Sequence, residues 1–409
     1  LWELMTSGHS AIDTVPSERA EFHADTATRW MGTLEGVGEF DARFFDIAPR
    51  EAFQMDPRQR LLMQEMWHAI EDAALTDEEL HHERVGVYVG IEEGDYLGLL
   101  ESASVTSNAN SVLAARISYF LNLSGPCMAI NTACSSGLAA LHQARLGLET
   151  GDCDTAIVAA ANIISDSKVY DAMADAGMLS STGVCRAYDG EADGMVPGEA
   201  VAVIVLQRES KARGQGRRVR ARLLSSAMNY DGRSQSITAP SGHAQEEVIR
   251  RALANADVTT DSIGLVIGHG TGTPLGDPIE VSALANAYAD ASQQSIALMS
   301  VKPTVGHAQA TAGLINLIVA MAAMEHGSIP PSLSCGHPSD HVAWETTPFW
   351  LNRELTSWPQ GAALRRSATS AFGFSGTNVH VILEQGDPKP TAAGTATPTL
   401  LVVSDRKSV

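Results

Sequence analysis

Residues 131–137 read Asn-Thr-Ala-Cys-Ser-Ser-Gly, and this segment decides the fold. An apolar run precedes it at residues 128–130, and residues 138–148 follow with the apolar spacing of a helix. The pattern predicts a strand, a tight turn and a helix, with Cys134 at the start of the helix. Unpaired amides and the helix dipole at such a position favour a thiolate, which is a strong nucleophile. A small buried cysteine is the alternative interpretation of Cys134.

Two glycine-rich loops farther along the chain each carry a histidine. His269 follows the apolar run at residues 265–267, which is typical of a buried strand. His307 precedes residues 311–324, which are apolar nearly all round and predict a buried helix. Glycines beside a histidine leave its ring uncovered and let the backbone approach a ligand. Each histidine alone fits a structural role, whereas together with Cys134 they indicate a nucleophilic active site.

These segments resemble the signatures of β-ketoacyl synthases, most closely the ketosynthase domains of bacterial modular type I polyketide synthases. They are Cys-Ser-Ser at 134–136, His-Gly-Thr-Gly-Thr at 269–273, and Lys302 with Gly-His at 306–307. Further matching segments follow the order of the family: Phe-Asp-Ala-Arg-Phe-Phe at 40–45, Met-Asp-Pro-Arg-Gln-Arg at 55–60, Asp-Gly-Met-Val-Pro-Gly-Glu at 193–199 and Ser-Ala-Phe-Gly-Phe-Ser-Gly-Thr-Asn at 370–378. Residues 119–123 and 196–199 resemble systems whose acyltransferase acts in trans.

The resemblance implies the thiolase fold, an α/β fold with two pseudo-symmetric βαβ halves in a layered α-β-α-β-α arrangement. The alternation of helical and strand patterns agrees with an α/β class. Residues 1–237 form the N-terminal half with the nucleophilic cysteine, and residues 238–386 form the C-terminal half with the two histidines. The Pro, Ala, Thr and Gly content of residues 387–399 predicts a linker, and residues 400–409 begin a following linker or domain. Residues 1–4 already have a helical pattern where the family has an upstream strand, so we expect the natural start to lie earlier.

The resemblance also implies catalytic roles. Cys134 holds the acyl chain, and its backbone amide and that of Phe374 form an oxyanion hole, with Phe374 as a gate. His269 and His307 donate hydrogen bonds to a malonyl thioester and stabilise its enolate. Lys302 supports the histidine loop electrostatically.

Four residues of the first histidine loop have supporting roles. The resemblance implies that the hydroxyls of Thr271 and Thr273 bind the pantetheine arm of a carrier protein, and the alternative is that they are turn residues. Asp277 and Glu280 are expected to brace the loop rather than to act as acid or base. No site residue is expected to bind a metal.

Some positions depart from the family pattern. The family has Glu-Ala before the first histidine, where this chain has Ile267 and Gly268. It has Ser/Thr-Asn after the lysine, where this chain has Pro303 and Thr304, and a serine at the position of Gly137. These changes make a domain that accepts acyl chains but condenses poorly an alternative to full elongation.

Composition excludes several classes of partner. The 409-residue chain has a formal net charge of −20, which argues against nucleic acid or anionic membrane as a general partner. Its longest apolar stretch, residues 313–324, is too short to cross a bilayer. Basic residues cluster at 208–222, either as a solvated loop or as a docking patch for an acidic carrier protein. Five scattered cysteines without metal-ligand spacing suit reduced thiols in the cytoplasm: Cys127, Cys134, Cys153, Cys185 and Cys335.

The implied function is a β-ketoacyl synthase, a carbon–carbon bond-forming acyltransferase of polyketide biosynthesis. Cys134 takes an acyl chain from an acyl carrier protein and extends it by decarboxylative Claisen condensation with a malonyl-type thioester. The domain itself binds no cofactor, since the phosphopantetheine belongs to the carrier protein. A second copy of the chain, as a homodimer, and other domains of a larger synthase are the further expected partners.

Other functions remain open at this point. A non-elongating acyl-transfer or docking ketosynthase retains the same residues, and a stand-alone fatty-acid ketosynthase has the same fold. A thiolase that uses coenzyme A arranges its cysteine and histidine differently, and a Cys–His hydrolase does not explain two histidines in glycine-threonine loops. The acyl chain and the extender unit are set by tertiary contacts that the sequence does not reveal.

Overall fold

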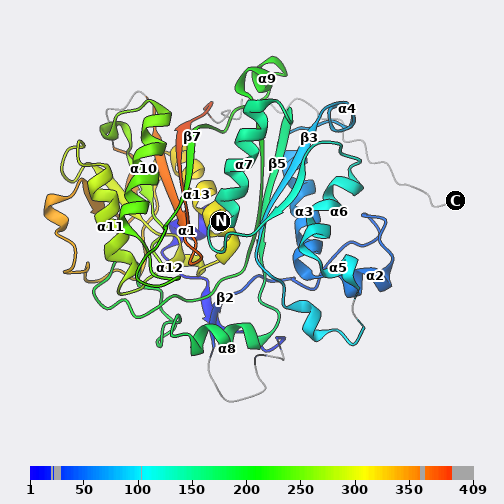
Figure 1. The fold of residues 1–409 in the computed structure, drawn as a ribbon, viewed down its shortest axis with the longest axis horizontal. Coiled ribbons are helices and arrows are strands. Elements are labelled where there is room, and N and C mark those ends of the chain that lie inside the picture. Colours follow the sequence, from blue (N-terminus) through cyan, green and yellow to red (C-terminus); the bar gives the residue numbers. More distant parts are fainter. Residues whose placement is uncertain (20–21, 23–28, 103, 360–363, 389–409) are drawn as a thin grey trace, which may run out of the picture.

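The computed structural model describes residues 1–19, 22, 29–102, 104–359 and 364–388. Two sheets form its centre (Figure 1). The first has the order β4-β3-β5-β6 and consists of β4 (Cys127–Ile130), β3 (Val85–Ile91), β5 (Thr155–Asn162) and β6 (Ala200–Gln207). The second has the order β11-β9-β8-β13-β14-β7 and consists of β11 (Phe349–Leu351), β9 (Ile296–Met299), β8 (Leu265–Ile267), β13 (Arg366–Phe372), β14 (Thr377–Gln385) and β7 (Ala221–Tyr230).

The two sheets repeat one pattern of strand directions. In the first, β4 and β5 both pair in parallel with β3, and β6 runs antiparallel to β5. In the second, β9 and β13 both pair in parallel with β8, and β14 runs antiparallel to β13. Strand β3 is therefore equivalent to β8, and β4 is equivalent to β9. This topology gives the two similar halves that the resemblance implied, although the sequence shows no internal repeat.

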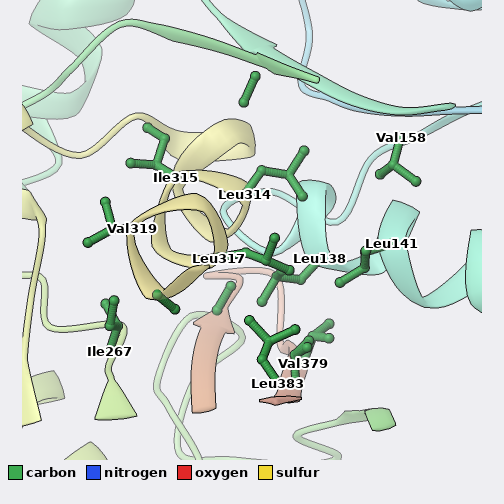
Figure 2. Packing of buried hydrophobic residues seen from close by; sticks show 14 of the residues in the cluster. Leu138, Leu141, Val158, Ile267, Leu314, Ile315, Leu317, Val319, Val379 and Leu383 are labelled. Atoms are coloured by element: carbon green, nitrogen blue, oxygen red, sulfur yellow. The ribbon is translucent and has the colours of Figure 1, made fainter. Parts of the chain in front are cut away.

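Helices α7 (Ser136–Thr150) and α13 (Ala312–His326) form the central layer between the sheets (Figure 2). They contribute to one buried cluster with side chains from both sheets, among them Leu138 of α7, Leu314 of α13, Val158 of β5 and Val379 of β14. Burying one leucine side chain in this way contributes roughly 1.5–3 kcal/mol. The central layer thus holds the two halves together.

Four helices cover the outer faces of the sheets. Helices α3 (Pro57–Asp72) and α6 (Asn110–Phe120) contact the first sheet, and α10 (Gly242–Ala256) contacts the second and also α11 (Gly276–Ala287). In β8, Leu265 and Ile267 join the central cluster, while Val266 joins the cluster under α10 and α11. Both faces of this strand are buried, which explains why its sequence is continuously apolar. The five layers are those expected for a thiolase fold.

Shorter elements complete the described chain. The other helices are α1 (Trp2–Ser7), α2 (Pro49–Gln54), α4 (Asp77–His82), α5 (Val105–Asn108), α8 (Ser167–Asp175), α9 (Glu209–Gly214) and α12 (Lys302–Val305). The other strands are β1 (Ile12–Thr14), β2 (Trp30–Gly32), β10 (Ser328–Ile329) and β12 (Thr356–Ser357). No helix of the described residues is both long and apolar enough to cross a bilayer.

The division between the halves differs in one respect from expectation. Strand β7 pairs with β14 in the second sheet, although its residues lie within the expected first half, residues 1–237. The chain passes from the first sheet to the second between β6 and β7, so the expected boundary at residue 237 lies one strand too late. Residues 389–409, which include most of the expected linker and the start of the expected following unit, lie outside the described residues.

Candidate active site

The turn that carries Cys134 is held by hydroxyl groups. Strand β4 ends at Ile130 and α7 begins at Ser136, so Cys134 lies two residues before the helix. Ala133 has a φ of 55°, a left-handed conformation that costs free energy in a non-glycine residue. Ser135 Oγ donates to the carbonyl of Thr132 at 2.8 Å, and Ser136 Oγ donates to that of Ala133 at 2.6 Å. These bonds fix the cysteine in the tight turn that the sequence predicted.

Burial, rather than the helix, dominates the ionisation of the thiol. Cys134 is 7% exposed. Burial raises the pKa of its thiol to about 12, and the carboxyl group of Glu92 raises it further. The charge of Lys302 and the backbone N–H groups of Phe374 and Cys134 lower this pKa, but by less. Burial therefore opposes the resting thiolate that the sequence favoured, because the loss of hydration raises the thiol pKa by more than Lys302 and the two backbone N–H groups lower it.

The backbone around His307 fixes the orientation of its ring. Its N–H donates to the carbonyl of Val196 at 2.7 Å, and its carbonyl accepts from Gly198 at 3.0 Å. The backbone N–H of Gln309 donates to Nδ1 of the ring at 3.1 Å. Burial, and then the charge of Lys302, hold the pKa of His307 well below its usual range. The neutral ring accepts at Nδ1 and so carries its proton on Nε2.

Two buried carboxylates brace the loop of His269, as the sequence predicted. Glu280 accepts the N–H of His269 at 2.5 Å and that of Gly270 at 2.7 Å. Asp277 accepts the N–H of Thr271 and that of Gly272, each at 3.1 Å. Nδ1 of His269 is buried without a hydrogen-bond partner among the described residues. Burial, followed by the charges of Lys302 and His307, holds the pKa of His269 well below its usual range.

Lys302 joins the two histidine loops. It is fully buried at the start of α12, and its Nζ donates to the carbonyl of His269. Pro303 occupies the first turn of the same helix, where the missing N–H of proline has no cost. The proline at position 303, where the family has serine or threonine, is therefore compatible with the backbone hydrogen bonds that hold His307.

The glycine-rich loop after β13 brings Phe374 to the cysteine. A Cβ atom at Gly373 would lie 2.3 Å from the carbonyl oxygen of Thr132, so the two segments are in direct contact. The side chain of Phe374 is 48% exposed, while its amide faces the thiol of Cys134. The rings of His269 and His307 have centroids 5.5 Å apart. The structure thus brings together turns from both halves of the chain.

The two threonines of the first loop lie side by side. Their hydroxyls, Thr271 Oγ1 and Thr273 Oγ1, are 3.1 Å apart, and both side chains are half-buried. Thr271 Oγ1 also lies 3.4 Å from Asp277. A hydroxyl can donate to one partner and accept from another, so this pair retains capacity for a ligand.

Comparisons with known proteins agree with this geometry. Three family models match consecutive parts of the chain: the β-ketoacyl synthase N-terminal domain at residues 1–212, its C-terminal domain at 220–336, and the ketoacyl-synthetase C-terminal extension at 338–409. The chain belongs to the β-ketoacyl synthase family. Enzymes of this family transfer acyl groups and form carbon–carbon bonds.

The ketosynthase is similar to parts of large synthases. It is 45% identical over 391 residues to the polyketide synthase ThaG of Burkholderia thailandensis, a match of 95% of this chain and 7% of that protein. It is 40% identical over 416 residues to the erythronolide synthase EryA3 of Saccharopolyspora erythraea, a match of 99% of this chain and 13% of that protein. The chain therefore spans a small fraction of the curated relatives that it matches.

Solved ketosynthase structures share the fold. The ketosynthase from module 6 of the bacillaene synthase of Bacillus subtilis 168 has a TM-score of 0.90 and 35% identity, over 95% of this chain and 69% of that chain. An oxazolomycin ketosynthase domain from Streptomyces albus JA3453 has a TM-score of 0.89 and 34% identity, over 95% of this chain and 73% of that chain. The thiolase fold implied by the sequence is confirmed.

One acidic residue near the ketosynthase site was not predicted from the sequence. Glu92 follows β3, and its Oε1 is buried without a hydrogen-bond partner among the described residues. Burial raises the pKa of Glu92 to about 7, and the charge of Arg58 opposes this rise. The sequence feature that could have identified Glu92 is its place directly after β3, two residues after Gly90, because that strand is buried throughout.

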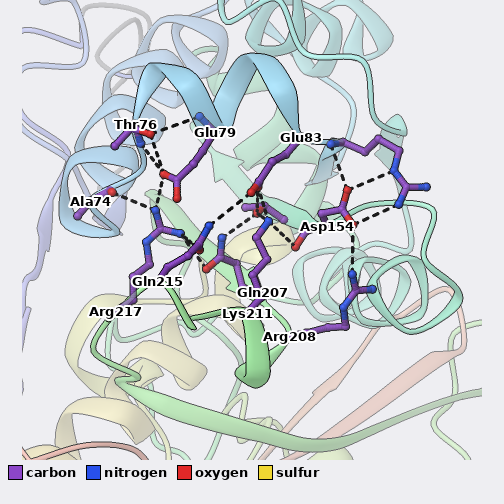
Figure 3. Close-up of polar contacts among 12 residues, drawn as sticks. Ala74, Thr76, Glu79, Glu83, Asp154, Gln207, Arg208, Lys211, Gln215 and Arg217 are labelled. Atoms are coloured by element: carbon purple, nitrogen blue, oxygen red, sulfur yellow. Dashed lines mark hydrogen bonds and ion pairs between the residues drawn. The ribbon is translucent and has the colours of Figure 1, made fainter. Parts of the chain in front are cut away.

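The basic cluster at residues 208–222 is engaged in internal ion pairs (Figure 3). Arg208 pairs with Asp154 at 3.1 Å, and Arg217 with Glu79 at 2.5 Å. The other basic residues of the cluster also pair with carboxylates: Lys211, Arg213, Arg218, Arg220 and Arg222. The cluster therefore presents little net positive charge, and its interpretation as a docking patch for a carrier protein is not supported.

Proposed function

We propose that this ketosynthase elongates polyketide chains. Cys134 accepts an acyl chain from an acyl carrier protein and joins it to a malonyl-type thioester by decarboxylative Claisen condensation. The observation that carries the proposal is the meeting of three turns: that of Cys134, that of His269 and that of His307, with the amide of Phe374 facing the sulfur. The similarity to polyketide synthases supports the pathway.

In the loading step, the sulfur of Cys134 attacks the thioester carbonyl of the acyl carrier. The amides of Cys134 and Phe374 stabilise the oxyanion, in the position where they face the sulfur. The carrier sulfur leaves and takes up the proton that the thiol of Cys134 gives up. Because burial raises the pKa of the Cys134 thiol, this proton transfer accompanies the attack on the carbonyl.

In the condensation step, a malonyl-type thioester loses carbon dioxide and becomes an enolate. His269 and His307 are neutral, so each offers one N–H donor to the thioester oxygen on which the negative charge develops. The enolate carbon attacks the acyl group on Cys134, forming the carbon–carbon bond and releasing the sulfur. The thiolate then regains a proton.

Two observations favour elongation over a non-elongating role. Pro303 fits the first turn of α12, so it does not disturb His307. Glu280 supplies two hydrogen bonds to the loop of His269, where the family carboxylate before the histidine is replaced by Ile267. The departures from the family pattern are thus compensated locally.

The partner that delivers the chains is an acyl carrier protein, and phosphopantetheine is its cofactor rather than one of this domain. The adjacent hydroxyls of Thr271 and Thr273 suit the amides of that arm. The five cysteines are all free, which suits a reducing compartment such as the cytoplasm.

A homodimer is also part of the proposal. Strand β4 lies at the edge of its sheet, with Cys127 exposed and Met128 38% exposed. An unpaired strand edge of this kind is able to pair with a second copy. Sedimentation of the chain is expected to give twice the monomer mass.

The test is a reconstituted condensation. The ketosynthase is incubated with an acyl-carrier protein and a malonyl-carrier protein, and mass spectrometry follows both the acyl group on Cys134 and the β-ketoacyl product. We expect both to form, and Cys134→Ala to lose both while it keeps its fold. Loading without product or carbon dioxide would instead establish the non-elongating role, and acylation of another cysteine would overturn the assignment of the nucleophile.

A further inference from the structure

Glu92 occupies the position in the first half that His269 occupies in the second. Strands β3 and β8 are equivalent, and in each the pairing with the next strand ends close to the site, at Gly90 with Ile130 and at Ile267 with Met299. Glu92 lies two residues after Gly90, as His269 lies two residues after Ile267. The pseudo-symmetry of the fold therefore gives Glu92 the position in the first half that is equivalent to the position of His269 in the second.

The surroundings of Glu92 belong to the active site. A Cβ atom at Gly90 would lie 2.5 Å from the backbone of Ser136, so the end of β3 abuts the turn of Cys134. The carboxyl group acts electrostatically on that thiol. The amide of Ala310, in the turn after His307, faces the carboxylate. Glu92 thus lies between the nucleophile and the second histidine turn.

One oxygen of this carboxylate lacks a partner. Oε1 of Glu92 is buried and accepts no hydrogen bond from the described residues. Arg58 is close, but it donates to the backbone carbonyl of Glu92 at 2.8 Å and pairs with Asp56 at 2.6 Å. A buried acceptor without a donor costs free energy, which a donor from a bound molecule would recover.

We propose that Glu92 is a specificity residue that selects acyl chains with a hydrogen-bond donor, a hydroxyl or an amino group, near the thioester. This inference rests on the proposed function, because the chain must be attached to Cys134 to bring its first carbons past Glu92. A saturated hydrocarbon chain leaves Oε1 without a donor. A site with a buried polar group rejects such a chain strongly, because the group then stays unpaired.

The experiment compares three N-acetylcysteamine thioesters of equal chain length: butyryl, 3-hydroxybutyryl and 3-aminobutyryl. Acylation of Cys134 by each is followed by mass spectrometry in the wild type, Glu92→Met and Glu92→Gln. Methionine is similar in size and lacks the carboxylate, whereas glutamine keeps one carbonyl acceptor and loses the charge. Glu93→Gln is the matched control, since Glu93 is the neighbouring residue and is exposed.

We expect the wild type and Glu93→Gln to prefer at least one donor-bearing chain over butyryl by tenfold or more. Glu92→Met should bring all three chains within about twofold, partly by faster acylation with butyryl, which also shows that it is folded. Glu92→Gln should keep a preference for the hydroxyl and lose that for the amine.

A wild type without any preference, or a preference that Glu92→Met retains, overturns the inference. If Glu92→Met does not fold, Glu92→Gln decides alone: an unchanged profile for all three chains then overturns the inference. If no thioester acylates wild-type Cys134, the proposed function itself fails, which is a different outcome from acylation without selection.

Discussion

Gln309 and His307 are joined by a hydrogen bond in which the backbone N–H of Gln309 donates to Nδ1 of the histidine, at 3.1 Å. Gln309 has a φ of 42°, so the chain accepts a strained conformation at this position. The bond fixes the tautomer of the neutral ring, whose proton lies on Nε2. His307 therefore presents a donor, and not an acceptor, on the side of the ring away from its own turn.

This relationship predicts that the histidines act in condensation rather than in loading. His307→Ala and His269→Ala should each lower condensation by about 10²-fold or more, the usual loss for one oxyanion donor. Acylation of Cys134 should change by only a few fold, because it depends on the amides of Cys134 and Phe374. Separate assays of loading and of carbon dioxide release measure the two steps.

His243→Ala is the control for these variants, since His243 is exposed. His307→Gln should recover part of the lost condensation, because its side-chain amide restores an N–H donor. Normal condensation with failed loading in the alanine variants would reverse the roles assigned here.

Much of the site was readable from the sequence because its residues lie in unusual turns. Cys134 and His269 each follow a strand, His307 follows the short helix α12, and glycines or hydroxyl residues surround all three. Lys302 was also identified, but its contact with the carbonyl of His269 depends on how two distant loops pack.

Other features could not be predicted because their cause is tertiary. A glutamate after a strand is usually solvated, and it is the packing of distant segments that buries Oε1 of Glu92. The arginines after residue 207 form a basic cluster in sequence, yet partners such as Glu79 and Asp154 come from distant segments. The raised pKa of Cys134 likewise depends on burial, which the motif alone does not report.

The ionisation of Cys134 predicts a steep pH dependence. Burial raises the pKa of the free thiol to about 12, so the thiolate fraction increases about tenfold for each unit of pH well below that value. Alkylation of Cys134 by iodoacetamide should therefore become about tenfold faster per unit between pH 7 and pH 9. A Cys127→Ala background removes the exposed thiol from the measurement. A rate that is already constant at pH 7 would mean that the thiolate is the resting form.

The close packing of Gly373 predicts that adding one methyl group there, in Gly373→Ala, impairs the acylation of Cys134. The Cβ of Gly373→Ala would lie 2.3 Å from the oxygen of Thr132, which is backbone and does not move aside easily. The loop with Phe374 should shift away from the thiol. We expect acylation to fall tenfold or more and stability to fall by about 1–3 kcal/mol, as in other overpacked sites.

Gly336→Ala is the matched substitution, since among the described residues no heavy atom beyond its own chain neighbours lies within 4 Å of a Cβ at Gly336. It should leave both the thermal midpoint and the acylation rate close to those of the wild type. Equal behaviour of the two glycine variants would show that the close approach of Gly373 to Thr132 is not required.

The last prediction concerns the carrier protein. Charge reversal at Arg208 or Arg222 should change acylation from the carrier by less than about twofold, because both side chains already pair with carboxylates, Asp154 and Glu384. The Arg208–Asp154 pair is partly exposed, and such pairs contribute little and are screened by salt over about 8–10 Å. The measurement is the ratio of acylation from the carrier-bound group to acylation from its N-acetylcysteamine thioester, at low and high salt. This ratio should exceed one in the wild type and stay the same in Arg208→Glu and Arg222→Glu. A tenfold lower ratio in either variant, restored by reversal of charge on the carrier, would show that the carrier docks on this cluster despite its internal pairs.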